Sequence, residues 1–449
     1  MNPRILIVGG GAAGQSAAAA ARKTDRQAEI ILVTREKYPT YSRCGLPYVL
    51  GKEISAFENL ILFPMDYYRS MRMDIRLETE VTELDARSKT AALKDKNNQV
   101  EKIRFDSLVL ATGASSFIPP IKGSNLKGIY AIRTIDDGKA IESVLSPGKN
   151  AVIVGGGITA VEMADALALR GLKVTIIYRK QYLLRMMFDQ DMAEMIQQGL
   201  IDQGVVIEFE KSPDEIKGDE EVKSIVAGEE EIPADIVIMT TGFRANNQFA
   251  IANGIEIGPS GGFKVDSRAK TNLEGVYSAG DCTECLNLLT GEPFLPQLGT
   301  VAARQGTAAG INAAGGEAHY PGALGAGVSK ITKVEFGSTG LTMSQAEEAK
   351  IQAIAASIKW RTAAEYYPGW KEIKVKLVAD KATGRLIGGQ MAAEGGGRVA
   401  SMVDMVTTAI QAKMTIKDFS VIDTCYSPPV ADVWNPIMLA AENLLRRMR

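Results

Sequence analysis

Two glycine-rich motifs, each lying between an apolar segment and an Ala-rich segment, constrain the fold more than any other feature of the chain. The first is Gly9-Gly10-Gly11-Ala12-Ala13-Gly14, after Ile5-Leu6-Ile7-Val8, and the second is Gly155-Gly156-Gly157-Ile158-Thr159-Ala160, after Ala151-Val152-Ile153-Val154. A strand, a glycine turn and a helix in this order bring bare backbone close to a pyrophosphate at a helix N-terminus. Two such units predict two bound dinucleotides, and the simplest reason to bind two is to pass electrons between them.

Composition narrows the class of protein further. The chain has 449 residues, 46% of them hydrophobic, which is enough for two to four domains. The formal net charge of -2 gives no basic surface for nucleic acid or anionic lipid. The chain enters a strand within a few residues, and no apolar run reaches the roughly 18 residues that span a bilayer. We therefore expect a cytoplasmic enzyme with no membrane and no nucleic-acid partner.

The four cysteines are treated separately, because so few in a long chain indicate reduced thiols rather than a disulfide framework. Cys44 precedes Gly45-Leu46-Pro47, and a proline there favours the first turn of a helix. The helix dipole and Arg43 are expected to acidify the thiol, so that Cys44 is a thiolate at neutral pH. Cys282 and Cys285 form a Cys-x-x-Cys without a second ligand pair, so we predict no metal site. Buried structural thiols are the favoured interpretation of this pair, with a secondary dithiol left open.

Strand-like segments that end on glycine divide the chain. Val109-Leu110-Ala111-Thr112-Gly113 and Ile238-Met239-Thr240-Thr241-Gly242 close two similar units, which indicates an internal duplication. Ser278-Ala279-Gly280-Asp281 is a third such ending, and an Ala-rich helix is predicted at about 299–314. From about residue 325 the pattern changes to alternating strands, such as Ile373-Lys374-Val375-Lys376-Leu377-Val378, and to a helix at about 398–413.

The ordered motifs resemble the pyridine nucleotide-disulfide oxidoreductase superfamily over essentially the full length of the chain. The closest likeness is to the single-cysteine branch, which contains coenzyme A disulfide reductase, NADH oxidase and NADH peroxidase. The resemblance implies an α/β fold with two Rossmann-like dinucleotide-binding domains and a C-terminal α+β dimerisation domain, and hence a homodimer. The FAD-binding domain would comprise residues 1–115 and 245–324, the NAD(P)-binding domain residues 116–244, and the dimerisation domain residues 325–449.

The resemblance also implies the cofactor-binding residues. FAD is expected to contact Gly9, Gly11, Ala12, Ala13, Gly14, Arg35, Glu36, Arg43, Val81, Ala111, Thr112, Gly113, Gly280, Asp281, Gly299, Thr300 and Ala303. Thr34 stands where the ribose-binding acid is expected, so that Glu36 would take that role after a small loop shift. NADPH or NADH is expected to contact Gly155, Gly157, Ile158, Glu162, Tyr178, Arg179, Lys180 and Gly242.

Charge at the end of the second strand of the second unit bears on the choice of nicotinamide. An acid at this position binds the ribose of NAD and repels the additional phosphate of NADP. Tyr178 stands there instead, and two cations, Arg179 and Lys180, follow it. We predict tolerance of NADPH and a preference for it, with a merely solvated loop as the alternative.

The catalytic residues follow from the same likeness. General disulfide reductases of the superfamily carry a second cysteine five positions after the first, but this chain has Val49 there. The resemblance therefore implies that no internal Cys-Cys disulfide forms, and that the second sulfur comes from the substrate or is replaced by oxygen. Cys-Gly-Leu-Pro-Tyr is similar to the segment in coenzyme A disulfide reductases. Tyr426, in Tyr426-Ser427-Pro428-Pro429, would approach the partner subunit's cysteine and donate a proton to the leaving thiolate. Tyr367 is a second substrate-side candidate, and Cys425 is a hypothetical resolving thiol.

We therefore expect an NAD(P)H-dependent flavoenzyme that reduces coenzyme A disulfide, coenzyme A persulfide or polysulfide through Cys44. Arg22 and Lys23 are candidate contacts for a coenzyme A phosphate, with exposure to solvent as the alternative. Ala12 stands where peroxidases of the branch carry histidine, which disfavours hydroperoxide chemistry. Two alternatives stay open: an NAD(P)H oxidase that produces hydrogen peroxide, and an electron-entry flavoprotein that reduces a partner protein.

Overall fold

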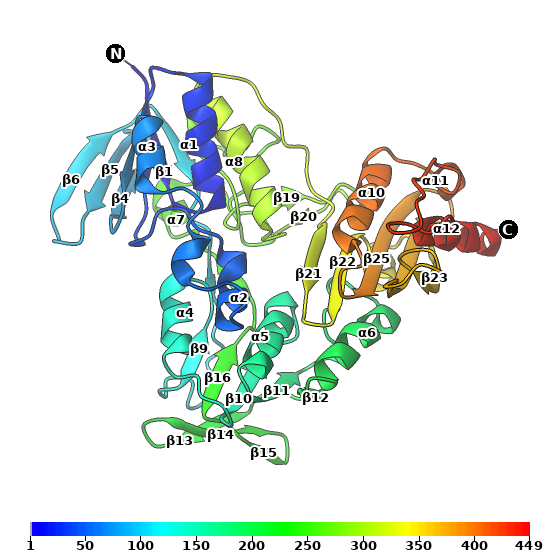
Figure 1. Cartoon of the computed structure of the whole chain (residues 1–449). Helices are drawn as coiled ribbons and strands as arrows, with labels where there is room; N and C mark the ends of the chain where they lie inside the picture. The colour runs from blue at the N-terminus through cyan, green and yellow to red at the C-terminus, as the bar shows by residue number, and fades with distance from the viewer. Residues whose placement is uncertain (1) are drawn as a thin grey trace.

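The first unit is built around a parallel sheet that draws its strands from distant parts of the chain. The computed structural model describes residues 2–449 (Figure 1). The strand order is β18-β7-β1-β2-β3, and every neighbouring pair is parallel. The strands are β1 (Arg4–Val8), β2 (Glu29–Val33), β3 (Met73–Arg76), β7 (Ser107–Leu110) and β18 (Val276–Ser278). Their short apolar runs fit strands that are covered on both faces.

Two helices of this unit, α1 (Ala12–Thr24) and α8 (Gly299–Ala313), cross at very short range (Figure 1). A Cβ added at Gly306 would lie 2.2 Å from the carbonyl oxygen of Ala13, and one added at Gly310 would lie 2.1 Å from that of Ala17. The two glycines are four residues apart and therefore share one face of α8. The Ala-rich sequence of α1 and these glycines thus allow backbone-to-backbone packing directly behind the first glycine motif.

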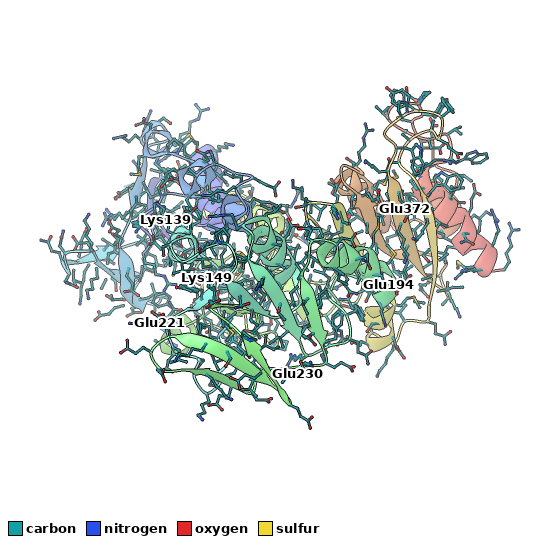
Figure 2. All side chains as sticks on the ribbon, turned by 60° about the horizontal axis from the view of Figure 1, so that its bottom comes forward. Lys139, Lys149, Glu194, Glu221, Glu230 and Glu372 are labelled. Carbon is teal, nitrogen blue, oxygen red and sulfur yellow. The ribbon has the colours of Figure 1, made fainter. Side chains whose placement is uncertain are left out.

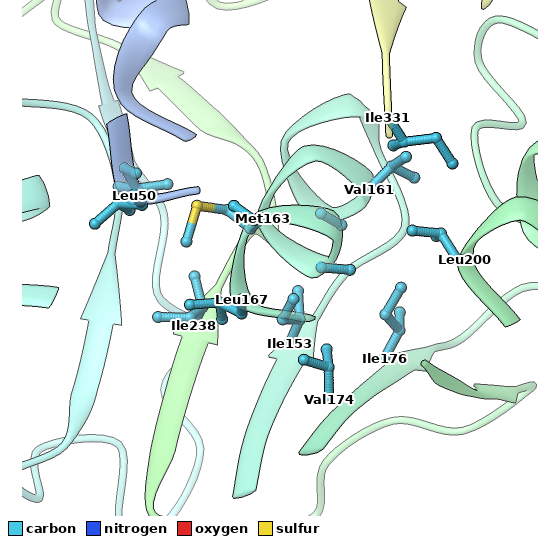
Figure 3. Packing of buried hydrophobic residues seen from close by; sticks show 14 of the residues in the cluster. Leu50, Ile153, Val161, Met163, Leu167, Val174, Ile176, Leu200, Ile238 and Ile331 are labelled. Carbon is cyan, nitrogen blue, oxygen red and sulfur yellow. The ribbon is translucent and has the colours of Figure 1, made fainter. Parts of the chain in front are cut away.

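The second unit repeats this plan, which confirms the predicted α/β fold. Its parallel sheet has the order β12-β11-β10-β16-β9. The strands are β9 (Ile129–Ala131), β10 (Asn150–Val154), β11 (Lys173–Tyr178), β12 (Val206–Phe209) and β16 (Ile236–Met239), and the helices are α4 (Ile135–Glu142), α5 (Ile158–Leu169) and α6 (Gln190–Ile201). Figure 3 shows Leu167 of α5 with Ile153 and Ile238 of the sheet, in one buried cluster.

Smaller elements surround the two sheets. Two short strands, where the chain passes between the two units, pair with each other in antiparallel fashion. In addition, each unit is flanked by an antiparallel sheet of three strands. Glu221 and Glu230 project outward from the one that flanks the second unit (Figure 2). These elements are η1 (Arg43–Gly45), α2 (Leu46–Leu50), η2 (Phe57–Leu60), α3 (Met65–Ser70), β4 (Glu80–Asp85), β5 (Thr90–Lys94), β6 (Val100–Arg104), β8 (Ala114–Ser116), β13 (Glu215–Gly218), β14 (Val222–Ala227), β15 (Glu230–Pro233), β17 (Phe243–Ala245), α7 (Phe249–Asn253), β19 (Cys285–Leu286) and β20 (Pro293–Phe294).

The C-terminal unit is an antiparallel sheet in the order β21-β22-β25-β24-β23 with helices packed against it. The strand predicted at 373–378 lies within β24, and the helix predicted at about 398–413 is α10. The elements are β21 (Gly327–Lys330), β22 (Val334–Gly340), α9 (Met343–Glu348), β23 (Ala353–Arg361), β24 (Glu372–Asp380), β25 (Leu386–Glu394), α10 (Val399–Gln411), α11 (Ile416–Phe419) and α12 (Pro436–Arg447). None of the helices in residues 2–449 combines the length and apolar character that a bilayer crossing requires.

A buried polar cluster ties the second unit to this C-terminal sheet. Lys376 of β24 contacts Asp189, just before α6, at 3.0 Å, and both side chains are nearly buried. Gln390 of β25 donates to the same carboxylate at 2.8 Å and accepts from the Asp189 backbone at 2.8 Å. Because the charged groups of this cluster are paired, the structure avoids the larger cost of a buried charge without a partner.

Candidate functional site

A cavity of about 780 Å³ opens at the carboxyl ends of the strands of the first sheet. This edge of a parallel sheet is where ligands of such folds bind. The cavity collects most of the residues predicted for FAD: Gly9, Gly11, Ala12, Ala13, Arg35, Glu36, Arg43, Val81, Ala111, Thr112, Gly113, Gly280, Asp281, Gly299 and Ala303, together with Cys44. Gly14 and Thr300 do not line it.

The first glycine motif leaves backbone free to face the cavity. Gly9 has φ +118°, and a Cβ there would lie 2.0 Å from the carbonyl oxygen of Ala111. A Cβ at Gly14 would lie 1.8 Å from the carbonyl oxygen of Gly9, so Gly14 acts in close packing and not on the ligand. The N-cap of α1, Gly11, has no side-chain cap. The first N–H groups of α1 are therefore available for an anion.

Unpaired polar atoms in the wall test whether a dinucleotide fits. Four side chains that line the cavity carry a buried nitrogen or oxygen with no hydrogen-bond partner: Gln15, Ser116, Arg133 and Gln297. Buried polar groups in native proteins are almost always paired with protein, ligand or ordered water, so these atoms are available to a polar ligand. The phosphates, ribityl hydroxyls and ring polar groups of FAD supply such partners, and the residues present fit this cofactor.

Glu36 is held more firmly than the sequence predicted. Arg43 is ion-paired with Glu36 Oε1, and the Tyr41 hydroxyl donates to Glu36 Oε2 at 2.6 Å. Burial raises the pKa of Tyr41 above its ordinary value, so that this hydroxyl stays a donor. The hydroxyl of Thr34, two residues earlier, is buried and accepts from the Glu36 backbone N–H at 3.3 Å. Glu36 lines the cavity with both oxygens already bound by protein.

Cys44 lies in η1, directly before the short helix α2, with Pro47 in the first turn as predicted. The prediction that Arg43 acidifies its thiol is wrong, because the Arg43 guanidinium is directed to Glu36 and to the carbonyl oxygen of Arg133 at 2.8 Å. In this protein, burial raises the pKa of the Cys44 thiol, and the carboxylates of Glu162 and Asp281 raise it further. α2 has only five residues, which limits its dipole.

Arg133 is a site residue that the sequence analysis missed. It follows β9 of the second unit, yet its guanidinium forms an ion pair with Asp281 of the first unit and lies 4.6 Å from the ring centroid of Phe243. Asp281, the predicted flavin contact, is thus already paired with a cation. No local pattern marks Arg133, because tertiary folding alone brings it to the cavity.

The second glycine motif has the same backbone geometry as the first. Gly155 has φ +135°, and a Cβ at Gly157 would meet open space. A Cβ at Gly156 would lie 2.5 Å from the Tyr178 ring, which packs beneath the turn. Arg179 and Lys180 are exposed at the end of β11 and form no ion pair within residues 2–449. Ile158 begins α5, and Gly242 has φ +110° with open space around it.

Glu162 of α5 is the most perturbed acid near Cys44. The Ser329 hydroxyl donates to Glu162 Oε1 at 2.5 Å, and the Tyr48 hydroxyl lies 3.5 Å from the same atom. Burial raises the pKa of Glu162 to about 7. This carboxyl was predicted only as a nicotinamide contact.

The predicted tyrosines lie far along the chain on the C-terminal unit. Tyr426 is half exposed, and its hydroxyl lies 2.8 Å from that of Tyr366, which was not among the predicted residues. Tyr367, the predicted one, is also exposed. Large apolar side chains are also exposed in the same two stretches of the chain: Trp370, Val421, Val430, Val433 and Trp434. Cys425 is exposed and free.

The remaining candidate residues have structural or surface roles. Cys282 and Cys285 are free and buried in two different apolar clusters, which argues against a shared dithiol. Among residues 2–449 no three His, Cys, Asp or Glu side chains gather in a metal-binding arrangement. Arg22 donates to four backbone carbonyl oxygens, among them those of Met71 at 2.9 Å and Arg72 at 2.8 Å, which occupies its guanidinium; Lys23 is exposed.

Comparisons with known proteins agree with this arrangement. Residues 3–306 match the model of the pyridine nucleotide-disulphide oxidoreductase family, and residues 328–436 match its dimerisation domain. An NADH oxidase of Methanocaldococcus jannaschii is 38% identical over 448 residues, covering 99% of each chain. An NAD(P)H coenzyme A polysulfide/persulfide reductase of Pyrococcus horikoshii is 34% identical, also covering 99% of each. A solved NAD-dependent persulfide reductase from A. fulgidus superposes with a TM-score of 0.95 at 31% identity, covering 99% of this chain and 83% of that one.

These matches bear out the predicted family, the enzyme class and the cofactors. Members of the family are oxidoreductases that bind FAD and NAD(P)H, and the relatives include both NADH oxidases and NAD(P)H sulfur oxidoreductases. The match to a dimerisation domain agrees with a homodimer. The chain therefore belongs to the pyridine nucleotide-disulphide oxidoreductase family and is an FAD- and NAD(P)H-dependent oxidoreductase.

Proposed function

We propose that this enzyme reduces coenzyme A disulfide, coenzyme A persulfide or polysulfide through Cys44. The observation that carries the proposal is a free thiol in the wall of a cavity that fits a flavin. Val49 of α2 is buried, and neither η1 nor α2 contains a second cysteine beside Cys44. We therefore propose that Cys44 forms its mixed disulfide with a sulfur of the substrate.

The chemistry divides between cofactors and protein. When bound, NAD(P)H would supply a hydride, and FAD would pass its two electrons on to sulfur. The protein supplies the Cys44 thiolate, which attacks a substrate disulfide; a bond forms between Cys44 Sγ and one substrate sulfur, and the other sulfur leaves as a thiolate. We propose Tyr426 of the partner subunit as the proton donor to this leaving thiolate, with Tyr367 as the secondary candidate.

The exposed apolar side chains around Tyr426 support a homodimer as part of this proposal. Trp434 and Val433 are 58% and 59% exposed in the single chain. Several large exposed apolar side chains in one stretch of chain are typical of interaction sites. A second copy of the chain covering this surface would bring Tyr426 and Cys425 to the cavity of the first.

The proposed function is tested by anaerobic turnover with a panel of acceptors. NADPH and NADH oxidation is measured with coenzyme A disulfide, coenzyme A persulfide, polysulfide and glutathione disulfide. We expect the coenzyme A or polysulfide acceptors to give the highest kcat/KM. Turnover with none of these sulfur acceptors would overturn the proposal.

A peroxide-forming NAD(P)H oxidase is the second candidate, favoured by the NADH oxidase from Methanocaldococcus jannaschii among the relatives. Ala12 lines the cavity and offers no acid-base group to oxygen species, which supports sulfur over peroxide chemistry. The oxidase is distinguished by oxygen consumption equal to NAD(P)H consumption in the absence of any sulfur compound.

We further propose that NADPH is the preferred donor, and that Arg179 binds its additional phosphate. Replacing Arg179 by Glu is expected to lower kcat/KM for NADPH by about 10- to 100-fold, because a charge-assisted hydrogen bond contributes about 1.5–3 kcal/mol and the new carboxylate repels the phosphate. The kcat/KM for NADH should stay nearly constant. The matched control is Lys173→Glu at the exposed start of the same strand, and equal losses with both donors would contradict the assignment.

A further inference from the structure

A strained residue lies against the second glycine motif. Leu184, in the loop 182–189 that leads into α6, has φ +59° and is buried. A left-handed backbone conformation is rare for a bulky residue, and it persists only where the surrounding structure holds it. The N–H of Leu184 donates to the carbonyl oxygen of Gly156 at 2.7 Å. The strained conformation therefore connects the loop directly to the turn of the motif.

This hydrogen bond fixes a peptide plane of the motif. In a trans peptide the C=O and the following N–H point in opposite directions, and the bond between Gly156 and Gly157 is trans. Because Leu184 holds the Gly156 carbonyl oxygen, the Gly157 N–H points away from the loop. That N–H has no backbone acceptor in the described part of the chain, and Gly157 is the N-cap of α5 without a side-chain cap. It is therefore one of the donors that the turn offers to a pyrophosphate.

The C-terminal unit holds the far end of loop 182–189. The Asp189 N–H donates to Gln390 Oε1 at 2.8 Å, and Gln390 Nε2 donates back to the carboxylate at 2.8 Å. The same carboxylate is ion-paired with Lys376 at 3.0 Å and accepts from the Met343 N–H at 3.0 Å. These partners belong to α9, β24 and β25. Three elements of the C-terminal unit thus bind one residue of a loop that belongs to the second unit.

Packing and a further hydrogen bond hold the residues between Leu184 and this polar cluster. Phe188 is fully buried, and its ring meets that of Phe336 of β22 edge to face, with the centroids 6.0 Å apart. Gln345 of α9 donates to the carbonyl oxygen of Met186 at 3.2 Å. The C-terminal unit therefore contacts positions 186, 188 and 189, immediately after the strained residue.

We propose that Asp189, Lys376 and Gln390 are positioning residues for NAD(P)H. Through loop 182–189 they fix the Gly156 carbonyl oxygen and thereby aim the Gly157 N–H at the pyrophosphate of the dinucleotide. The C-terminal unit, predicted only as a dimerisation domain, thus completes the NAD(P)H site of its own chain. The inference rests on the second glycine motif as that site, and it does not depend on the proposed sulfur acceptor.

The test measures binding of NADP⁺ and NAD⁺ to the oxidised, FAD-bound protein by isothermal titration calorimetry. We expect Lys376→Met to raise both Kd values by about tenfold, the scale of one lost hydrogen bond to a charged group. The ratio of the two Kd values should stay constant, because the pyrophosphate is common to both dinucleotides. With ferricyanide as acceptor, KM for NAD(P)H should rise while kcat changes by less than about twofold, since such a contact stabilises ground state and transition state equally.

Two further variants keep the test decisive. Gln390→Met retains the ion pair and a side chain of similar size but loses the bond to the Asp189 N–H, so both Kd values should again rise. This variant decides the outcome if Lys376→Met fails to retain FAD. Lys359→Met is the matched control, because it removes an exposed ion pair with Glu372 from the same sheet and should leave both Kd values unchanged.

The FAD absorption spectrum and the urea midpoint report folding of each variant. Wild-type Kd values in FAD-bound Gln390→Met and Lys376→Met would overturn the inference, and so would an equal rise in Lys359→Met. Raised Kd values in a protein that turns over no sulfur acceptor would uphold the positioning role and reject only the proposed function.

Discussion

Replacing Cys44 by serine is expected to lower turnover of every disulfide or persulfide acceptor by roughly 1000-fold or more, the scale on which loss of a catalytic nucleophile acts. A serine hydroxyl cannot form the bond to the substrate sulfur. The side chain points into an existing cavity, so FAD should be retained, and its absorption spectrum serves as the check on folding. Anaerobic NADPH oxidation with coenzyme A disulfide is the measurement.

The matched control for this variant is Cys285→Ala. Cys285 is buried in a separate apolar cluster, and burial raises the pKa of its thiol to about 11, which leaves it unreactive. Its activity should stay within a factor of about two of the wild type, since small buried changes away from the site act mainly on stability. If Cys44→Ser keeps full turnover, the flavin alone carries the chemistry and electrons pass to oxygen or to a partner protein.

The largest effect on stability is expected at the crossing of α1 and α8. Gly310→Val would place side-chain carbon at 2.1 Å from the carbonyl oxygen of Ala17, so the two helices must separate. Overpacking of this kind costs about 3 kcal/mol or more where backbone has to move. We expect a lower urea midpoint and loss of FAD, because α1 begins at the first glycine motif.

Thr307→Val is the control for Gly310→Val on the same helix. Thr307 is exposed, and both residues at this position are β-branched, so the change in unfolding free energy should stay within about 0.5 kcal/mol. If Gly310→Val retained FAD and the wild-type midpoint, the close contact of the two helices would not be needed for the cofactor site.

Local pattern was sufficient to predict most of the fold. The apolar runs before each glycine motif became β1 and β10, and the alternating segment at 373–378 became part of β24, because strand and helix periodicity are local properties. Motif residues at the ends of parallel strands also came together as predicted, since those ends meet at one edge of the sheet.

The electrostatics of the site could not be predicted from sequence. Arg43 is adjacent to Cys44 in the chain, yet Glu36, seven residues away, holds its guanidinium. Arg133 reaches Asp281 across 148 positions. The hydroxyl that contacts Tyr426 belongs to Tyr366 and not to the predicted residue, Tyr367. The reason is that neighbouring residues in an extended or turning chain point in different directions. Each of these outcomes depends on side-chain direction and distant partners, which a motif does not encode.

The split origin of the first sheet sets an order for folding during synthesis. β18 and α8 complete the FAD-binding unit, but they come at residues 276–278 and 299–313, long after β1. At roughly 5–20 residues per second, a ribosome needs on the order of tens of seconds to supply them. The second sheet, which is contiguous from β9 to β16, leaves the ribosome complete before that time. The nascent chain should therefore fold its nicotinamide-binding unit first and bind FAD last. Until α8 is synthesised, α1 lacks the helix against which it packs.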